Sequence, residues 1–277
     1  MDRSTSGFSN LIATPKSRRN ALAAAGKGAA GAMLMSALGT RFAWADASGD
    51  VDIGTRCLTG LYSGGEGIHF DTDYYREHHM ATVMKFYGKS IKRFEARKTV
   101  TGGGGVGAPA FAGAVNIWIA DEKAFEEASK MHGQDLGNDV KNFTNGMLTM
   151  QNDVVYGEAG LGASAMKVGD RCMTILYPHS EGDHFNYDYY RDHHLTAIMK
   201  LYGPKAISRF ELNKGLSSQD GSGPAPYNAT VTIYIADQAA FDAAGKTEGP
   251  KLPPDVHNFS PVNPVAFPTE VFAIAEN

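Results

Sequence analysis

The chain has 277 residues, of which 43% are hydrophobic and 20% are charged, and its formal net charge is −4. This length and hydrophobic fraction suffice for a sizeable core in one or two domains. Two cysteines without a Cys-x-x-Cys pair argue against a zinc or disulfide scaffold. The acidic balance argues against nucleic acid or an anionic membrane as the partner of the mature protein.

Residues 1–47 have the features of an export signal. An arginine pair at 18–19 precedes a mildly apolar run over 21–38, and small-x-small cleavage sites end at Ala45 and Ala47. The run is too mild for a membrane span, which needs roughly 20 strongly apolar residues. We therefore predict a twin-arginine-type signal peptide, cleaved after Ala45 or Ala47, and a periplasmic or secreted protein with the export machinery as a partner.

The rest of the chain alternates between predicted strands and helices. Apolar alternation, β-prone residues and helix caps predict a first series over 55–62 (strand), 71–87 (helix), 91–100 (strand), 112–120 (strand), 122–131 (helix) and 148–156 (strand). The second half repeats the order with strands at 171–177, 207–214, 229–236 and one ending near 274, and helices at 187–202 and from 237. We place repeat 1 at 55–157, a glycine-rich linker at 158–169 and repeat 2 at 170–277.

The repeat is clearest in one helix. Asp73-Tyr-Tyr-Arg-Glu-His-His-Met-Ala-Thr-Val-Met-Lys-Phe-Tyr-Gly88 recurs 115 residues later, beginning at Asp188, with ten of sixteen positions identical. Asp71 and Asn186 stand where an N-cap belongs, and Gly88 is typical of a helix end. At 100° per residue, Met80, Val83, Met84 and Tyr87 share a core face that Arg76 and Asp73 continue, and Tyr75, His79 and Phe86 form a flanking stripe.

Each half thus has the order βαββαβ, which predicts a four-stranded antiparallel sheet with both helices on one face, the ferredoxin-like arrangement. Such a sheet leaves its other face uncovered, and packing the two sheets of a tandem repeat together would bury both faces. We predict an α+β fold in which two ferredoxin-like repeats form an intrachain pseudo-dimeric α/β barrel. Further oligomerisation remains open.

The chain resembles the EthD family of the dimeric α/β-barrel superfamily. The resemblance rests on three motifs that occur once in each half and together span the predicted mature chain: Asp73-Tyr-Tyr-Arg-x-His-His79 and Asp188–His194, Arg93-Phe-Glu95 and Arg209-Phe-Glu211, Asp139-Val-x-Asn-Phe143 and Asp255–Phe259. It implies small aromatic or ether-like substrates and a role in oxidative degradation. Relatives in the superfamily include cyclases, isomerases, cofactor-free monooxygenases and haem binders. The export signal and the two domains on one chain depart from the usual single-domain homodimer.

Several residue pairs are candidates for acid–base chemistry, each with a structural alternative. His69 and His184 could reach over the helix N-terminus to Asp73 and Asp188, giving an acid–base pair near neutral pH. The two aspartates could instead complement the helix dipole or pair with the arginine three residues later. His79 and His194 are catalytic candidates or interface residues. Adjacent histidines on a helix point about 100° apart, so we predict no metal site.

Four aromatic residues are candidates for substrate binding. Tyr75 and Tyr190 share the stripe of His79 and His194, although core packing is the alternative role. Trp118 and Tyr234 occupy equivalent places on a central strand and could line the barrel interior. In Arg93-Phe-Glu95, alternation puts the two charged residues on one face, where they could form ion pairs between the halves.

Three functions follow from these observations. The first is an exported oxidoreductase-type or cofactor-free enzyme that acts on a small apolar or aromatic molecule. The second is a non-catalytic carrier of such a ligand, and the third is a haem- or metal-binding protein. The sequence requires no particular cofactor, since its glycine run at 102–105 precedes a strand rather than a helix. Cys57 and Cys172 are predicted to be buried free thiols, with a disulfide as the alternative.

Overall fold

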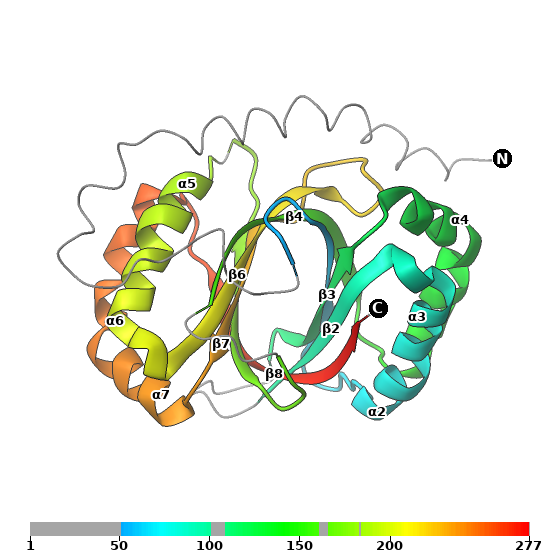
Figure 1. Cartoon of the computed structure of the whole chain (residues 1–277), viewed down its shortest axis with the longest axis horizontal. Helices are drawn as coiled ribbons and strands as arrows, with labels where there is room; N and C mark the ends of the chain where they lie inside the picture. The colour runs from blue at the N-terminus through cyan, green and yellow to red at the C-terminus, as the bar shows by residue number, and fades with distance from the viewer. Residues whose placement is uncertain (1–50, 101–108, 161–165, 183, 277) are drawn as a thin grey trace.

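The computed structural model of the chain describes residues 51–100, 109–160, 166–182 and 184–276, so the predicted signal peptide lies outside the described residues. The described chain is an α+β fold around a closed antiparallel barrel of eight strands, in the order β1-β3-β2-β8-β5-β7-β6-β4 (Figure 1). The strands are β1 (Arg56–Ser63), β2 (Ile91–Thr99), β3 (Phe111–Ile119), β4 (Leu148–Gly160), β5 (Arg171–Pro178), β6 (Ile207–Ser218), β7 (Tyr227–Ile235) and β8 (Val265–Glu276).

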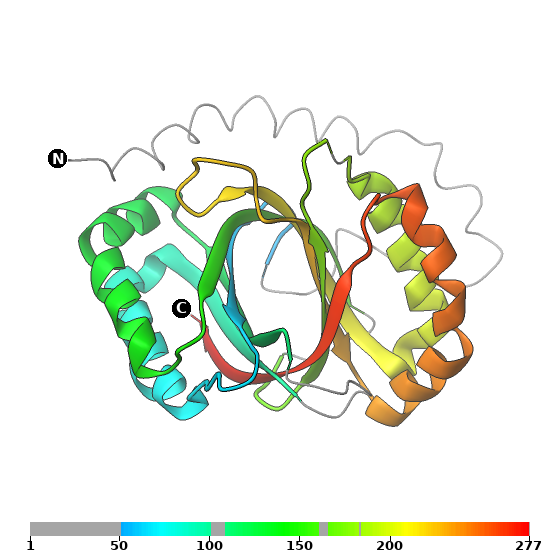
Figure 2. The same ribbon diagram turned by 180° about the vertical axis from the view of Figure 1, so that it is seen from behind.

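The helices lie outside the barrel, in one group on each of two opposite sides (Figures 1 and 2). On one side are α2 (Thr72–Tyr74), the π-helical turn Tyr75–Met80, α3 (Ala81–Tyr87) and α4 (Glu122–Asp139). On the other are α5 (Tyr187–Tyr189), the π-helical turn Tyr190–Leu195, α6 (Thr196–Ala206) and α7 (Gln238–Thr247). Short 3₁₀ turns occur at Gly88–Ser90, Val140–Asn142, Gly249–Lys251 and Pro253–Asn258.

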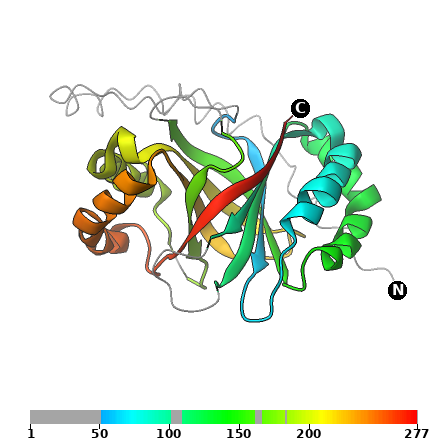
Figure 3. The same ribbon diagram turned by 90° about the horizontal axis from the view of Figure 1, so that it is seen from below.

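Each half of the chain contributes four neighbouring strands, in the orders β4-β1-β3-β2 and β8-β5-β7-β6. Two pairings between the halves close the barrel, β2 with β8 and β4 with β6. Figure 3 shows β8 crossing between the two groups of helices. The sheets are therefore joined edge to edge, and closure leaves no unpaired sheet edge.

Alternation along the strands separates an interior face from a face covered by helices. On β2, Phe94 packs in the apolar layer under the helices, whereas Glu95 receives a hydrogen bond from Tyr234 of β7. Since β2 and β7 are not neighbours in the barrel, that contact crosses the interior. The prediction that Arg93 and Glu95 share one face, opposite Phe94, is confirmed.

The duplicated helix begins as predicted but turns differently. The Asp71 side chain accepts hydrogen bonds from the backbone N–H groups of Asp73 and Tyr74, as an N-cap should. The π-helical turn that follows holds more residues than an α-helical turn. Side chains on either side of it therefore point in directions that differ from those expected at 100° per residue. The buried residues are Tyr75, His79, Met80 and Val83, while Arg76 and Asp73 are exposed. The predicted continuation of the core face through Arg76 and Asp73 was wrong for that reason.

Other corrections concern element lengths. The helix predicted over 122–131 continues to Asp139, past Gly133 and Gly137, whose low helix propensity hides the continuation. Strands β4 and β6 extend four residues beyond their predicted ends, because they pair with each other along the junction of the two halves. Part of the predicted linker is thus strand. No helix within the described ranges is long and apolar enough to cross a membrane.

Candidate functional site

A buried histidine paired with a carboxylate lies where the duplicated helix meets the end of α4. The Nδ1 atom of His79 is 2.7 Å from Oδ2 of Asp139, the last residue of α4. The His79 side chain is 8% exposed and packs between the rings of Tyr75 and Phe143, with centroids 5.0 Å and 4.8 Å away. Because Nδ1 faces the carboxylate, Nε2 is the nitrogen left to accept or donate a proton.

Two further side chains hold the carboxylate of this pair. The Tyr74 hydroxyl donates to Oδ1 of Asp139 at 2.9 Å, and the Asn142 amide donates to the same oxygen at 2.8 Å. Both oxygens of Asp139 are therefore engaged, one by the imidazole and the other by the phenol and the amide. Such a carboxylate fixes the orientation and tautomer of its histidine.

The second half contains the same arrangement, with Asp255 in the 3₁₀ turn Pro253–Asn258 after α7 rather than at the end of a helix. Oδ2 of Asp255 lies 2.7 Å from Nδ1 of His194, and Oδ1 accepts from Tyr189 at 2.7 Å and from Asn258 at 2.8 Å. The ring of Phe259 packs on His194 with centroids 4.6 Å apart. We call the two sets, each of a histidine, aspartate, tyrosine and asparagine, the first and second His–Asp sites.

Burial and hydrogen bonding set the charges in these sites. Burial lowers the pKa of His79 and of His194 below the ordinary value, and the hydrogen bond that each imidazole donates to its aspartate only partly opposes this effect. Burial works to raise the pKa of Asp139, but the hydrogen bonds with His79, Asn142 and Tyr74 outweigh it and the pKa is lowered. Asp255 behaves in the same way. At neutral pH each site thus holds a neutral imidazole beside a carboxylate, which is the state of a general base.

An open hollow of about 450 Å³ lies beside the second His–Asp site. Two of its lining residues belong to that site or contact it: Asn258 holds Asp255, and Phe259 packs on His194. The other lining residues come from the β5–α5 loop and from the segment before β8: Glu181, Gly182, His184, Asn186, His257, Ser260 and Pro261. The volume falls in the range typical of small-molecule sites.

The other predicted acid–base residues lie on the surface. Asp73 is an ion-pair partner of Arg76 at 3.0 Å with a side chain 76% exposed, and Asp188 pairs with Arg191 at 3.1 Å. Asp188 also accepts a hydrogen bond from Tyr156 of β4 at 2.7 Å. His69 is exposed, and the hydrogen bonds of the described chain do not join it to Asp73. In the described part of the chain, the aspartates predicted to pair with His69 and His184 instead pair with arginines.

The four candidate aromatic residues fall into two groups. Tyr75 and Tyr190 are buried beside His79 and His194, so the structure brings these pairs together. Trp118 and Tyr234 face the barrel interior, as predicted, and are buried there. Both interior rings contact charged side chains. The guanidinium of Arg93 stacks on Trp118 at 4.6 Å, and the Tyr234 hydroxyl donates to Glu95 at 3.1 Å.

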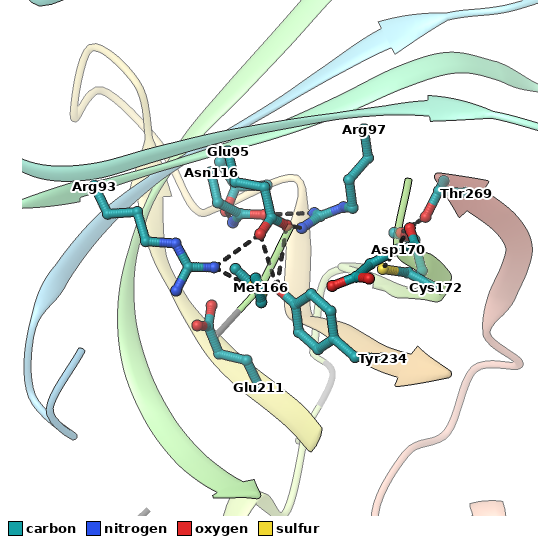
Figure 4. Close-up of polar contacts among 12 residues, drawn as sticks. Arg93, Glu95, Arg97, Asn116, Met166, Asp170, Cys172, Glu211, Tyr234 and Thr269 are labelled. Atoms are coloured by element: carbon teal, nitrogen blue, oxygen red, sulfur yellow. Dashed lines mark hydrogen bonds and ion pairs between the residues drawn. The ribbon is translucent and has the colours of Figure 1, made fainter. Parts of the chain in front are cut away.

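The barrel interior holds a network of buried charges around Glu95 (Figure 4). Glu95 is fully buried and accepts hydrogen bonds from Arg93 at 2.8 Å, from Arg97 and from Tyr234. A second ion pair, from Arg209 of β6 to Glu158 of β4 at 2.7 Å, joins the two halves. Glu95 differs from the prediction of an ion pair between the halves, because it pairs with Arg93 and Arg97 of its own strand. These side chains lie buried within the barrel, where they link strands of both halves.

Asp153 of β4 is a further buried carboxyl in the interior. Burial raises its pKa to about 7, despite hydrogen bonds from Thr59 and Gln151 that favour the charged form. In the unfolded chain the carboxyl loses its proton near pH 4, whereas in the folded chain it keeps it until about pH 7. Folding stability should therefore fall as pH rises through this window and level off above it.

Asp153→Asn is expected to remove most of this pH dependence, because the amide stays neutral. When the pH is raised from 4.5 to 7.5, the free energy of unfolding of the variant should rise by roughly 2–4 kcal/mol relative to that of wild type. Urea unfolding at these two pH values measures the difference. Glu158, whose pKa burial also raises to about 7, leaves part of the slope in the variant. Equal pH slopes in the two proteins would contradict the assignment.

Cys57 and Cys172 are buried free thiols, as predicted. They occupy equivalent positions on β1 and β5, each paired with the interior aromatic residue of the neighbouring strand. Within the ranges that the structure describes, no group of three or more His, Cys, Asp or Glu side chains is placed to hold a metal ion.

The sequence reasoning missed the roles of Asp139 and Asp255. It singled out Asp-Val-x-Asn-Phe only as part of a family resemblance. The available signal was that both halves keep this motif about 60 residues after the second histidine of the pair. A carboxylate repeated at constant separation from a histidine is a candidate for contact with it.

Comparisons with known proteins gave matches to solved structures at low sequence identity. No family model matches the chain, and no curated protein does. An EthD-like protein from Ralstonia eutropha matches with 24% identity over 40% of this chain and 93% of its own, with a TM-score of 0.33. An anthrone oxidase-like protein matches at 11% identity over 85% and 96%, with a TM-score of 0.48. A candidate monooxygenase from Fusobacterium nucleatum matches at 8% identity over 81% and 95%, with a TM-score of 0.49. The fold assignment itself rests on the strand pairing described above.

Proposed function

We propose that this protein is an exported enzyme of the EthD-like type that removes a proton from a small aromatic or otherwise apolar molecule. The observation that carries the proposal is the buried histidine whose Nδ1 is held 2.7 Å from a carboxylate, present in both halves. The chain is proposed to be two ferredoxin-like repeats that form an intrachain pseudo-dimer. The arginine pair at 18–19 and the apolar run that follows support twin-arginine export to the periplasm or outside the cell.

The geometry supports proton abstraction. Asp139 and Asp255 keep the Nδ1–H of His79 and His194 in place, so that Nε2 has its lone pair available. When Nε2 takes a proton, the positive charge that develops on the imidazole is stabilised by the adjacent carboxylate. Since the pKa of each histidine is lowered, the imidazole is neutral and ready to act as a base at neutral pH.

The oxidoreductase class follows from the same step. Removal of a proton from an activated C–H group leaves its electron pair on the substrate, and an electron-rich aromatic carbanion can pass electrons to dissolved O₂. O₂ takes up the electron pair and bonds to the carbon as a peroxide, and the imidazolium returns its proton to give a hydroperoxide. Loss of water then leaves a carbonyl, so O₂ is the oxidant and the protein supplies the base and the binding site. Phe259, which packs on His194, also lines the hollow beside the second His–Asp site and gives it an aromatic wall.

The test is turnover of a panel of aromatic compounds with an acidic C–H or phenolic O–H group, including anthrone and naphthols. O₂ uptake and product absorbance are followed for wild type and for a His79→Gln, His194→Gln double variant. Glutamine keeps a polar group of similar size and cannot act as a base. We expect wild type to turn over at least one compound, and the double variant to lose turnover by about 10²–10⁴-fold.

An exposed histidine pair gives the matched control. His78 and His193 directly precede His79 and His194 on the same helical segments, and both are exposed. The double variant His78→Gln, His193→Gln should retain wild-type turnover. Equal turnover by all three proteins would contradict the acid–base function, as would a wild type inactive on the whole panel. Binding without turnover would favour a carrier.

A further inference from the structure

Four oxygen-bearing side chains form a patch on the inner wall of the barrel, on β4, β6 and β7. Glu158 of β4 lies directly opposite Glu211 of β6. Asn213, two residues further along β6, lies directly opposite Thr230 of β7. Leu212 belongs to the apolar core under the helices, so alternation turns Glu211 and Asn213 to the interior. We call Glu158, Glu211, Asn213 and Thr230 the oxygen patch.

Two oxygens of the patch are buried and have no hydrogen-bond partner in the described part of the chain. They are Oδ1 of Asn213 and Oγ1 of Thr230, which are 2% and 5% exposed as residues. The amide of Asn213 donates to Oε1 of Glu211 at 2.8 Å, which leaves its Oδ1 as an acceptor. Directly opposed side chains have Cβ atoms about 4.5–5.5 Å apart, so one bound group can contact both oxygens. Since buried polar atoms are nearly always satisfied, the two oxygens point to such a group.

The charges inside the barrel favour a cation as that group. Figure 4 shows Glu211 among the charged side chains of the interior. Glu158 and Glu211 share one guanidinium, because Nη2 of Arg209 lies 2.7 Å from the first and 3.5 Å from the second. Like charges directly opposite each other destabilise a sheet. Among the described residues, four carboxyl groups inside the barrel face only three guanidinium groups, which leaves one negative charge when all are ionised: Glu95, Asp153, Glu158 and Glu211 against Arg93, Arg97 and Arg209.

Most unpartnered donors of the interior lie on another part of the wall. The Nε–H groups of Arg93 and Arg97 and the indole N–H of Trp118 are buried without a partner on β2 and β3. These strands stand opposite β6 and β7 in the order of the closed barrel. The Nε–H of Arg209 is the exception on β6, and that guanidinium already pairs with Glu158. At Asn213 and Thr230 the unpartnered atoms are oxygens, which suit a cation.

We propose that the oxygen patch binds one monovalent hard cation, Na⁺ or K⁺, inside the barrel. Hard cations take oxygen ligands from carboxylates, amides and water. One such ion balances the single excess negative charge. With two carboxylates, the patch differs from sites built on three or more His, Cys, Asp or Glu side chains, of which the described ranges have none. The ion would link β4 and β6, the strands at which the two halves meet, and it is independent of the His–Asp sites.

Thermal unfolding in different chloride salts tests the binding. The protein is dialysed into tetramethylammonium chloride, because the methyl groups of that cation keep oxygen ligands away from its charge. It is then compared in NaCl and in KCl at equal ionic strength. We expect the Tm to be higher by about 3–8 °C in at least one alkali salt and to saturate as its concentration rises. The salt with the lower half-maximal concentration identifies the ion. Equal Tm values in all three salts would overturn the proposal.

A variant of one patch residue and a matched control assign the effect to the patch. Thr230→Val keeps the shape of the side chain and removes only an unpartnered hydroxyl, so the protein should fold. It should need a roughly tenfold higher salt concentration for the half-maximal rise in Tm. Thr174→Val is the control, because Thr174 is also buried in the interior but its hydroxyl bonds to that of Thr269 at 3.0 Å. The control should respond to salt as wild type does, and an identical response of Thr230→Val would remove the patch as the site.

A crystal grown with RbCl locates the ion. Rb⁺ replaces Na⁺ or K⁺ and is recognised by its anomalous scattering, which water lacks. We expect one anomalous peak in contact with Oδ1 of Asn213 and Oγ1 of Thr230. Ordered water at this position without an anomalous peak would show that the two oxygens are satisfied by hydration, and the cation site would be wrong.

Discussion

Replacing Glu95 with alanine is expected to lower the free energy of unfolding by about 3–5 kcal/mol, enough to unfold many single domains. Glu95 is fully buried and accepts hydrogen bonds from Arg93 and Arg97, whose side chains are 2% exposed. Its removal would leave two guanidinium groups without their carboxylate in a medium of low polarity. The cost of a buried, unpaired charge exceeds the net value of the ion pair itself.

Urea unfolding followed by circular dichroism measures this change, with two variants as controls. Glu95→Gln keeps the shape and one acceptor oxygen, and should show a smaller loss than the alanine variant. Asp73→Asn breaks an ion pair with Arg76 in which both side chains are largely exposed, and should cost at most about 1 kcal/mol. Similar losses for Glu95→Ala and Asp73→Asn would show that the interior network does not stabilise the barrel.

Replacing both Asp139 and Asp255 with asparagine is expected to reduce turnover by about 10²–10⁴-fold, with little change in substrate affinity. The carboxylate accepts the Nδ1–H of its histidine at 2.7 Å, whereas an amide can turn its N–H₂ group toward Nδ1. The imidazole would then carry its proton on Nε2 and lose the lone pair that the reaction needs. Stabilisation of the imidazolium would be lost as well.

The pH profile distinguishes this effect from simple loss of structure. Burial lowers the pKa of His79 and His194, so wild-type kcat/KM should rise with pH, with its midpoint below the ordinary histidine pKa, and level off above that midpoint. Losing the negative charge should move the midpoint lower still in the asparagine variants. The double variant Tyr74→Phe, Tyr189→Phe keeps the carboxylates and should lose far less turnover. An unchanged midpoint and rate in the asparagine variants would remove the aspartates from the mechanism.

Several features of the molecule follow from local sequence. The sixteen-residue repeat identifies the duplication of the helix, because side-chain identity at a constant offset needs no tertiary information. Asp71 and Asn186 cap their helices as predicted, since an N-cap satisfies backbone N–H groups within three residues. Alternation along β2 correctly predicted that Arg93 and Glu95 lie on one face of the strand and Phe94 on the other, because side chains alternate with a period of two in any strand.

The site depended on contacts that no local pattern encodes. His79 and Asp139 are 60 residues apart, and their contact depends on where α4 ends, which is eight residues later than the propensities of Gly133 and Gly137 suggested. The π-helical turn at Tyr75–Met80 changed which side chains of the helix are buried. It thereby placed His79 in the core and left Asp73 in solvent.

By itself, the sequence determined the duplicated elements, their order and the two residue types, histidine and aspartate, that each half keeps. Only the tertiary structure decided which histidine meets which carboxylate, because pairing depends on where distant elements end and dock. It also decided that β2 pairs with β8 and β4 with β6, because the strand edges of the two halves meet only when the whole barrel closes.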